Sequence, residues 1–328
     1  MPEPTCGQSL CDADGQELCS HAIWGRRCRW GKRCSYSHAV PPDILEAYRT
    51  AAREQNASVN ARLAMSVPDP EIPTWLNDIQ AHAAVTSYDV TLWPLAEALR
   101  AVFELEEHDD FHNMHKKVLA GDPPLCPTLL QAYGAARGLD ALPEAWQVSW
   151  GQTKACREAM MRSAPFQRFL TLYDKFCASV IVPLTGDTAA YVQRPPTLRV
   201  HLAGQPQAKG RIGMHKDGDY PGHCAAEVNF WVPLAACGSN NSLFVESQEG
   251  RSDFKPLEMQ YGELFRFHGY SCRHHTEAND TGITRVSFDL RAVPASCCPP
   301  AALQGSRRGN RGLRIGDFRA VLVEAAKS

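Results

Sequence analysis

The sequence lacks long apolar runs and any strong excess of one charge. No uninterrupted hydrophobic segment approaches the roughly 20 residues that a transmembrane helix needs. Residues 1–18 are polar and contain acids, unlike a secretory signal peptide. The formal net charge is -2, which argues against a protein that coats nucleic acid or an anionic membrane over its whole surface. We therefore expect a cytoplasmic or nuclear protein without a membrane partner.

Internal repeats are absent as well, but cysteine is not scarce, with 13 among 328 residues. Outside residues 19–40 the cysteines are scattered, so we expect reduced thiols rather than a disulfide framework. The length allows one small module and one full-sized domain with its own core. The sequence predicts five parts: a disordered leader at 1–18, a cysteine-rich module at 19–40, a helical connector and linker at 41–74, the main domain at 75–294 and a basic tail at 295–328.

Four potential zinc ligands are clustered in the cysteine-rich module. They are Cys19, Cys28, Cys34 and His38, with the spacing Cys-x8-Cys-x5-Cys-x3-His. Three thiolates and one imidazole form a tetrahedral ligand set that zinc favours. The module is too short to build an apolar core, so metal binding would supply its folding energy. We therefore predict a structural Zn²⁺ site.

This module resembles the CCCH-type zinc fingers, through residues 25–28, 31–34 and 34–38. In that family an aromatic residue between the last cysteine and the histidine stacks on an RNA base, and Tyr36 holds that position here. Stacking combined with cationic side chains suits single-stranded RNA, and a single finger should bind it weakly. A protein-docking or purely structural finger is the alternative. The candidate RNA contacts are Tyr36, Trp24, Arg27, Arg29, Lys32 and Arg33, with Trp30 as another possible stacking face.

The predicted secondary structure of the main domain changes along its length from helices to strands. Residues 75–183 are mainly helical in pattern, with apolar side chains at helical spacing around Leu95 and around Phe169. After Pro195, short strands are separated by glycine, asparagine, aspartate and proline. The predicted strands are 198–202, 211–215, 226–233, 242–246, 255–260, 263–267 and 283–291. The sequence thus predicts an α+β fold: a β-sandwich or jelly roll with flanking helices.

A second set of candidate metal ligands lies among these strands. His215 and Asp217 end one predicted strand, and His274 precedes Arg285 in the last predicted strand by eleven residues. Two imidazoles and one carboxylate leave coordination positions open, as in the iron(II) sites of oxygenases. A His-x-Asp pair is common by chance in a chain of this composition. The prediction therefore depends on the surrounding strands as well.

In this context residues 165–294 resemble the iron(II)/2-oxoglutarate oxygenase superfamily. More narrowly, they resemble the phytanoyl-hydroxylase-type proteins that include the StrG-like streptomycin-biosynthesis family. The segments that carry the resemblance are 196–202, 214–220, 227–234, 241–247 and 279–288. The resemblance implies a double-stranded β-helix in which His215, Asp217 and His274 hold Fe²⁺. It further implies that Arg285, helped by Ser287, binds the far carboxylate of 2-oxoglutarate, and that the enzyme hydroxylates or otherwise oxidises its substrate.

Two alternatives concern the third ligand and the function. Adjacent side chains of a strand point to opposite faces, so only one of His274 and His275 can face the metal; the family's spacing to Arg285 favours His274. The substrate is either a small molecule or an RNA-associated one brought by the finger. The alternative function is a non-enzymatic RNA-binding protein with a catalytically inactive β-domain.

Several other polar residues are interpreted as structural or left open. His108, His112 and His115 recur on one helix face and are taken as a solvated or partly buried stripe rather than a metal site. Glu227 and Asn229 share one face of a predicted strand. They either contact substrate or cosubstrate, or are buried polar groups with their own hydrogen-bond partners.

Overall fold

The computed structural model describes residues 38–39, 72–103, 105, 110–115, 161–201, 203, 213–220, 222–298, 314–315 and 318–326. The chain divides into two units, Met1–Pro68 and Asp69–Ser328, and the fold described below belongs to the second unit. Of the predicted zinc finger only His38 and Ala39 are described, and both are exposed. The other zinc ligands, the RNA contacts and the connector helix lie outside the described residues and stay predictions.

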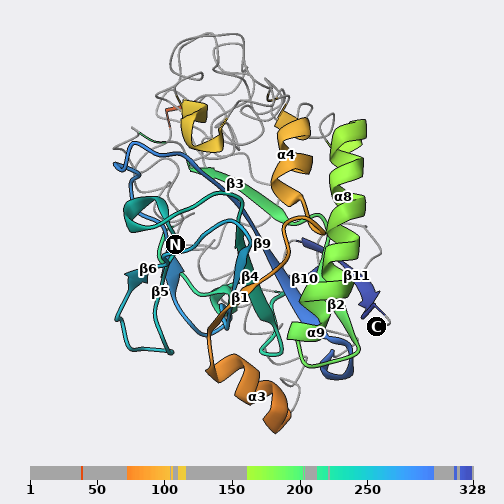
Figure 1. Ribbon diagram of the computed structural model, residues 1–328. Coiled ribbons are helices and arrows are strands. Elements are labelled where there is room, and N and C mark those ends of the chain that lie inside the picture. The colour runs from red at the N-terminus through yellow and green to blue at the C-terminus, as the bar shows by residue number, and fades with distance from the viewer. Residues whose placement is uncertain are drawn as a thin grey trace. The chain divides into compact units, whose positions relative to one another are not determined.

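Two antiparallel sheets form the second unit (Figure 1). The larger sheet has eight strands in the order β1-β7-β4-β9-β2-β11-β10, with β3 beside the first half of β9. The smaller sheet has the order β6-β5-β8. The strands are β1 (Ala84–Ser87), β2 (Ala189–Gln193), β3 (Thr197–His201), β4 (Val228–Pro233), β5 (Phe244–Val245), β6 (Lys255–Pro256), β7 (Glu263–Phe267), β8 (His274–His275), β9 (Arg285–Pro294), β10 (Arg314–Ile315) and β11 (Phe318–Glu324).

The described helices are α3 (Thr74–Ala81), α4 (Leu95–Phe103), α8 (Ala164–Phe176) and α9 (Val182–Leu184), with a π-helical turn η4 (Cys177–Ile181) after α8. Short 3-10 turns complete the described elements: η2 (Phe111–Asn113), η5 (Asp217–Asp219), η6 (Ser239–Asn241) and η7 (Ala295–Cys297). None of the helices in the described ranges has both the length and the apolar character needed to cross a membrane.

Helix α8 shows how sequence pattern becomes packing. Ser163 caps its N-terminus by accepting a hydrogen bond from the Phe166 N–H, and the apolar side chains predicted at helical spacing are buried along one face. Phe169 and Tyr173 on that face lie edge-on to Phe288 of β9, with ring centroids 6.2 and 5.9 Å away. Helix α4 lies beside α8 (Figure 1), so the main core lies between these helices and the sheet.

Strand β9 separates this core from a polar face. Its even-numbered residues from Val286 to Ala292 are buried in the core with the helices. Because side chains alternate along a strand, Arg285, Ser287, Asp289 and Arg291 all point to the opposite face, which we call the inner face. On the inner face a second apolar cluster joins the two sheets, and its members include Trp231, Leu243, Val245, Phe265 and Phe267. The inner face therefore combines charged side chains with a largely apolar surrounding.

The predicted strands from 195 onward are largely confirmed, and the helical and tail predictions need correction. A strand, β1, lies inside the stretch expected to be helical, and β2 was not predicted. Residues 295–328 were expected to be a basic tail, but Phe318–Glu324 forms β11 and pairs with β2. The predicted strand 211–215 lies partly outside the described residues, and its end makes a single bridge from His215 to His274. The tail prediction failed because arginine content says nothing about whether a strand edge elsewhere offers a partner.

Candidate metal centre

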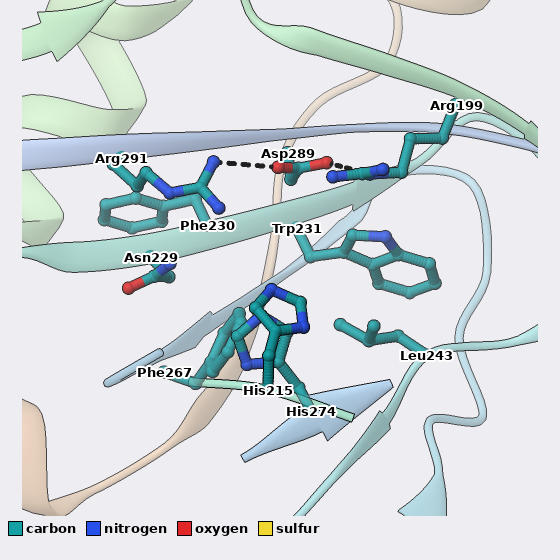
Figure 2. Close-up of a pocket in the computed structure, with 10 residues that line it drawn as sticks. All are labelled: Arg199, His215, Asn229, Phe230, Trp231, Leu243, Phe267, His274, Asp289 and Arg291. Atoms are coloured by element: carbon teal, nitrogen blue, oxygen red, sulfur yellow. Dashed lines mark hydrogen bonds and ion pairs between the residues drawn. The ribbon is translucent and has the colours of Figure 1, made fainter. Parts of the chain in front are cut away.

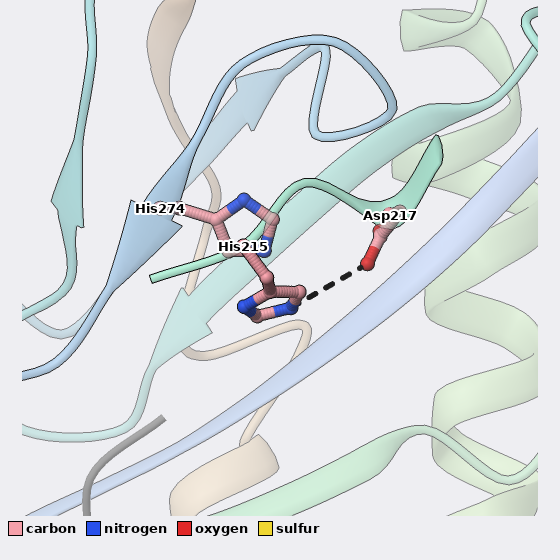
Figure 3. A group of neighbouring side chains, drawn as sticks. All are labelled: His215, Asp217 and His274. Carbon is pink, nitrogen blue, oxygen red and sulfur yellow. Dashed lines mark ion pairs between the residues drawn. The ribbon is translucent and has the colours of Figure 1, made fainter. Parts of the chain in front are cut away.

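His215, Asp217 and His274 come together at the edge between the two sheets (Figure 3). One possible ligand atom from each residue lies within 4.8 Å of the other two. The backbones of His215 and His274 exchange both hydrogen bonds of an antiparallel bridge, at 3.2 and 2.9 Å, which holds their rings 4.4 Å apart. The structure thus assembles the three predicted ligands from segments about 60 residues apart in the sequence. Iron binding by them is taken up below as a proposal.

Hydrogen bonds of the two imidazole rings suit metal binding. His215 Nδ1 lies 2.8 Å from the Gly213 carbonyl oxygen, and His274 Nδ1 lies 3.1 Å from the Cys272 carbonyl oxygen. A carbonyl can only accept, so each Nδ1 carries the proton and each Nε2 offers a lone pair. His215 Nε2 faces Asp217 Oδ1 at 3.8 Å. Burial lowers the pKa of His274 to about 4, which favours the neutral ring that a metal requires.

The Asp217 carboxylate is buried among hydrogen-bond donors. Arg291 Nε donates to Oδ2 at 2.8 Å and Arg291 Nη2 donates to Oδ1 at 3.0 Å, while Asn229 Nδ2 donates to Oδ2 at 2.7 Å. Burial acts to raise the pKa of Asp217, but the Arg291 guanidinium outweighs it and holds that pKa well below its usual range. The carboxylate is therefore ionised and fixed in orientation. Oδ1, with a single donor, is the oxygen that faces His215.

Two glycines allow the close approaches around Asp217. The Asp217 N–H donates to the Gly269 carbonyl at 2.8 Å, and Gly269 N–H donates to Asn229 Oδ1 at 2.9 Å. A Cβ atom on Gly269 would stand 2.5 Å from the Asn229 side chain, and one on Gly218 would stand 2.7 Å from the Tyr270 carbonyl oxygen. Glycine is therefore required at both positions for this backbone to hold Asp217.

The neighbouring His275 points away from the centre. Its ring stacks on Phe244 with centroids 5.1 Å apart, and its Nε2 lies 3.7 Å from Glu277. It belongs to none of the groups of possible metal ligands among the described residues. The alternation along β8 thus turns His274, and not His275, toward His215 and Asp217.

Strand β8 is anchored by a buried carboxylate. Both oxygens of Glu246 accept hydrogen bonds from Arg273, one of them from the Arg273 backbone N–H at 2.7 Å. The Ser252 N–H donates to Glu246 Oε2 at 3.0 Å, and the Glu246 N–H donates to the Arg273 carbonyl at 3.1 Å. Because Arg273 directly precedes His274, this clamp fixes the backbone that presents the third predicted ligand.

A second group of possible ligands shares Asp217. It consists of Asp217, His223 and Glu227, with ligand atoms again within 4.8 Å of one another. However, both carboxylate oxygens of Glu227 already have protein partners. Oε2 lies 2.8 Å from His223 Nδ1, and Oε1 accepts a hydrogen bond from the Cys224 N–H at 2.8 Å. We therefore assign Glu227 and Asn229 as satisfied buried groups that surround the centre, the second of the two interpretations left open by the sequence.

A cavity opens beside the centre on the inner face (Figure 2). It holds about 350 Å³ of space not filled by protein atoms, part of it open to solvent. His215 and His274 form one side, Trp231, Leu243 and Phe267 give an apolar wall, and Arg199, Asp289 and Arg291 give a charged wall. Asp289 joins the two arginines of that wall by ion pairs. A ligand in this cavity would touch both the possible metal ligands and positive charge.

Arg285 and Ser287 lie together on the inner face. Arg285 is 2% exposed, and its Nη1 donates to Ser287 Oγ at 2.9 Å. No ion pair involves Arg285 among the described residues, and its Nε has no hydrogen-bond partner there. Its guanidinium carbon lies 5.4 Å from the centre of the Trp231 ring. A buried arginine without a carboxylate is costly for a folded protein unless an anion binds it.

Sequence reasoning missed several residues of this site. Arg291, Asp289 and Arg199 were not singled out, nor was Glu246. The signal that could have found Asp289 and Arg291 is the strict alternation along 285–291, which puts every second residue of the final strand on the same face as Arg285. Arg199 lies on β3 and becomes a neighbour only through the pairing of β3 with β9. Glu246 carries no such signal, because its partner Arg273 comes from a distant segment, directly before β8.

Two residues of the predicted histidine stripe, His112 and His115, are described, and each ring has a hydrogen-bond partner in the protein. His112 Nε2 lies 3.0 Å from the Ala236 carbonyl, and His115 Nδ1 lies 3.0 Å from Thr284 Oγ1. His108 lies outside the described residues. The two described rings therefore tie η2 to the loops that surround β9 and β4.

Comparisons with known proteins find a relative whose sequence matches part of this chain, and several solved structures with low sequence identity to it. No protein-family model matches the chain. The streptomycin biosynthesis protein StrG of Streptomyces griseus is 40% identical over 119 residues, which cover 36% of this chain and 54% of that relative. The chain therefore spans about half the length of the curated relative it matches.

Three solved structures illustrate the distant similarity. EctD from S. alaskensis with 2-oxoglutarate and 5-hydroxyectoine is 15% identical with a TM-score of 0.42, covering 76% of this chain and 88% of that one. The non-heme monooxygenase ThoJ in complex with nickel is 12% identical with a TM-score of 0.41, covering 76% and 84%. HygX from Streptomyces hygroscopicus with nickel and 2-oxoglutarate is 14% identical with a TM-score of 0.22, covering 45% and 79%. Because these similarities are low, function is inferred below from the site and from the partial sequence relative.

Proposed function

We propose that this chain is an iron(II)- and 2-oxoglutarate-dependent dioxygenase that hydroxylates or otherwise oxidises a substrate of a class still to be identified. One observation carries the proposal: two imidazoles and a carboxylate converge beside a cavity on the inner face, and the same face of β9 holds a buried arginine that has no carboxylate partner among the described residues. We propose a double-stranded β-helix as the fold, in keeping with two antiparallel sheets that enclose the centre.

The donor set fits iron(II). His215 and His274 each offer Nε2, because their Nδ1 atoms donate to carbonyls, and Asp217 offers an ionised oxygen. Two neutral nitrogens and one carboxylate are the ligands of non-heme iron(II) oxygenases, and three ligands leave room for cosubstrate and oxygen. Arg291 and Asn229 would keep the carboxylate oriented when the metal binds.

Arg285 and Ser287 of β9 offer donors that fit a carboxylate. We propose that Arg285 and Ser287 bind the far carboxylate of 2-oxoglutarate, since a guanidinium recognises a carboxylate through two parallel hydrogen bonds. Bound iron and 2-oxoglutarate would together supply the oxygen activation and the oxidation of a substrate C–H bond. The chain itself would orient these groups, and the apolar wall of Trp231, Leu243 and Phe267 would keep water from them.

The partial relative agrees with a role in small-molecule chemistry. StrG is described as a streptomycin biosynthesis protein, and we propose by analogy a small-molecule substrate for this chain. An RNA-associated substrate delivered by the finger is the other candidate. It is favoured by the five cationic side chains between Cys19 and His38 and by Tyr36, which holds the stacking position of the CCCH-type fingers.

Anaerobic titration with iron(II) and 2-oxoglutarate tests the proposal. We expect a weak visible charge-transfer band that is lost in Arg285→Ala and in His274→Ala and kept in His275→Ala. The metal content of each variant, measured in parallel, separates loss of iron from loss of 2-oxoglutarate. A folded wild-type protein that gives no band would reject the oxygenase and leave the non-enzymatic RNA-binding protein as the function.

For the N-terminal unit we propose a structural zinc site of Cys19, Cys28, Cys34 and His38 that presents an RNA-binding surface. The ligand spacing and the lack of acidic residues between Cys19 and His38 support it. Elemental analysis tests it: the wild-type protein should carry one zinc per chain after purification without added metal. Cys34→Ser should lose that zinc, whereas Cys298→Ser, a substitution in the second unit, should keep it.

A further inference from the structure

We propose that Tyr220 and Asp219 form a substrate-binding rim at the candidate metal centre, and that the substrate is a small organic cation, an amine that is protonated at neutral pH. The reaction at the metal rests on the proposed function. The rim itself stands on the exposure, the ring contact and the charge found on the solvent side of His215.

Of the three predicted ligands, His215 is the one that meets solvent. Its side chain is 17% exposed, whereas the side chain of Asp217 is 3% exposed and His274 is 5% exposed. A molecule that comes from solvent therefore approaches the centre across His215. The residues that surround this ring are the ones that such a molecule contacts first.

Tyr220 stands beside that ring. The two rings lie edge to face, with centroids 5.6 Å apart. The Tyr220 N–H donates to the Asp217 carbonyl at 3.0 Å, which closes the turn η5 and holds the tyrosine close to both ligands. Tyr220 is nevertheless 53% exposed, the highest value of any aromatic among the described side chains. An aromatic ring that is fixed in place but left open to solvent is suited to contact a ligand.

A second exposed apolar residue flanks His215. Met214 directly precedes it and is 51% exposed. Single exposed apolar side chains are ordinary on protein surfaces. Here, however, two of the eight exposed large hydrophobic residues among the described side chains lie within five positions of one predicted ligand. The rim therefore offers apolar contact to the body of a small ligand.

The charges at the rim leave one carboxylate without a partner. Lys216 pairs with Glu249 at 3.2 Å, and Asp217 pairs with Arg291. Asp219 is exposed, and its N–H donates to the Lys216 carbonyl at 3.1 Å. Its carboxylate takes part in no hydrogen bond or ion pair with the described residues. A negative charge that no described residue neutralises therefore stands directly before Tyr220.

An aromatic ring next to an unpaired carboxylate is a combination that binds an ammonium group. The quadrupole of a tyrosine ring attracts a cation that lies over its face, and the carboxylate adds an ion pair. The same carboxylate repels a phosphate or another carboxylate. The rim therefore favours a small cation over an anionic substrate such as a nucleotide of RNA, which separates the two substrate classes considered above.

Titration of cyclohexylammonium into the full chain, loaded with iron(II) and 2-oxoglutarate without oxygen, tests the inference. Calorimetry and the change in the visible charge-transfer band both report binding. We expect cyclohexylammonium to bind about tenfold more tightly than cyclohexanecarboxylate, which has the same ring and the opposite charge. Tyr220→Leu should weaken its binding about two- to fivefold, the range of an exposed cation–π contact. Tyr220→Phe keeps the ring and should bind like wild type.

Charge reversal at Asp219 gives a second readout. Asp219→Lys should invert the preference, so that cyclohexanecarboxylate binds more tightly than cyclohexylammonium. Asp78→Lys, at an exposed position of α3, is the matched control and should keep the wild-type preference. Iron(II) affinity without either probe should be unchanged in Tyr220→Leu, because Tyr220 is not a predicted ligand.

The outcomes separate this inference from the proposed function. If the wild-type band forms and neither Tyr220→Leu nor Asp219→Lys changes the preference, the inference is wrong and the oxygenase stands. Asp219→Lys decides alone if Tyr220→Leu does not fold. If the wild type shows no band, the oxygenase fails, and calorimetry on the metal-free chain tests the rim. Binding of cyclohexylammonium that depends on Tyr220 then supports the rim, and absence of such binding overturns it. Tighter binding of cyclohexanecarboxylate by the wild type would overturn it in either case.

Discussion

Arg291 places one guanidinium nitrogen on each carboxylate oxygen of Asp217, at 2.8 and 3.0 Å. The contact joins two residues 74 positions apart in the chain, and both are almost fully buried. It fixes the plane of the carboxylate and keeps it ionised. Arg291 also donates to Asp289 at 3.0 Å, and Asp289 pairs with Arg199. A continuous line of ion pairs therefore runs from the proposed metal ligand to the charged wall of the cavity.

Replacing this bidentate contact should weaken metal binding. Arg291→Lys keeps the charge but offers a point donor instead of a planar fork, so we expect a ten- to hundredfold lower iron(II) affinity, as is usual when a partner of a metal ligand is changed. Direct titration of the metal, with circular dichroism as the check on folding, measures it. Arg266→Lys is the matched control, because Arg266 binds the carbonyls of Leu184 and His82. Equal iron affinity in Arg291→Lys and wild type would contradict the positioning role of Arg291.

The two adjacent histidines of β8 should behave differently. We expect His274→Ala to abolish iron binding, because it removes one of three proposed ligands. His275→Ala should keep iron and lose only the contacts with Phe244 and Glu277. Bound iron per chain after gel filtration distinguishes the two variants. Iron lost in His275→Ala and retained in His274→Ala would reverse the assignment.

The Glu246 clamp should make stability depend on pH in the acid range. Burial raises the pKa of Glu246, but hydrogen bonds from Arg273 and from backbone N–H groups outweigh it and bring the pKa to about 2 in the folded protein. Because the folded pKa lies below the unfolded one, the ionised carboxylate stabilises the fold fully above the usual glutamate range. That stabilisation is lost as the pH falls toward 2.

We therefore expect Glu246→Gln to lower the free energy of unfolding by about 2 kcal/mol at neutral pH. The difference from wild type should shrink steadily below about pH 4.5. Urea denaturation at several pH values measures it. Glu249→Gln, which removes an exposed ion pair with Lys216, should cost less than about 1 kcal/mol. A difference between Glu246→Gln and wild type that is constant with pH would show that ionisation of Glu246 does not matter.

Close packing at Gly269 should make an added methyl group costly. In Gly269→Ala the new Cβ would collide with Asn229 at 2.5 Å, so we expect a loss of about 1–3 kcal/mol of stability and weaker iron binding through the displaced Asn229–Asp217 hydrogen bond. Gly213→Ala is the control, because a Cβ there meets nothing within 4 Å. Thermal unfolding and iron titration of both variants measure the effect, and equal behaviour would contradict the role of Gly269.

RNA binding by the finger should depend on stacking by Tyr36. We expect Tyr36→Ala to weaken binding of a single-stranded RNA about tenfold, within the range of one lost base-stacking contact. Its iron content and its 2-oxoglutarate band should be unchanged. Tyr36→Phe keeps the ring and should bind like wild type. Fluorescence anisotropy at two salt concentrations measures it, and unchanged affinity in Tyr36→Ala would remove Tyr36 from the binding surface.

The sequence by itself determined which residue types were available and how they alternate. Strand pattern placed His215 and Asp217 at a strand end and Arg285 and Ser287 inside the last strand. It also established that only one of His274 and His275 can face a metal. These are local properties, because the period of a strand is written in consecutive residues. The strands at 228–233, 263–267 and 285–294 were predictable for the same reason.

Only the tertiary structure decided which strands became neighbours. Pairing of β9 with β3 and β4 brought Arg199 and Trp231 beside Arg285, and the return of β11 to β2 turned a predicted tail into part of the sheet. The Arg291–Asp217 contact arose in the same way. Each strand could pair with several distant segments, and the choice depends on the register and on which strand edges are free. No local pattern of residues specifies which pairing forms.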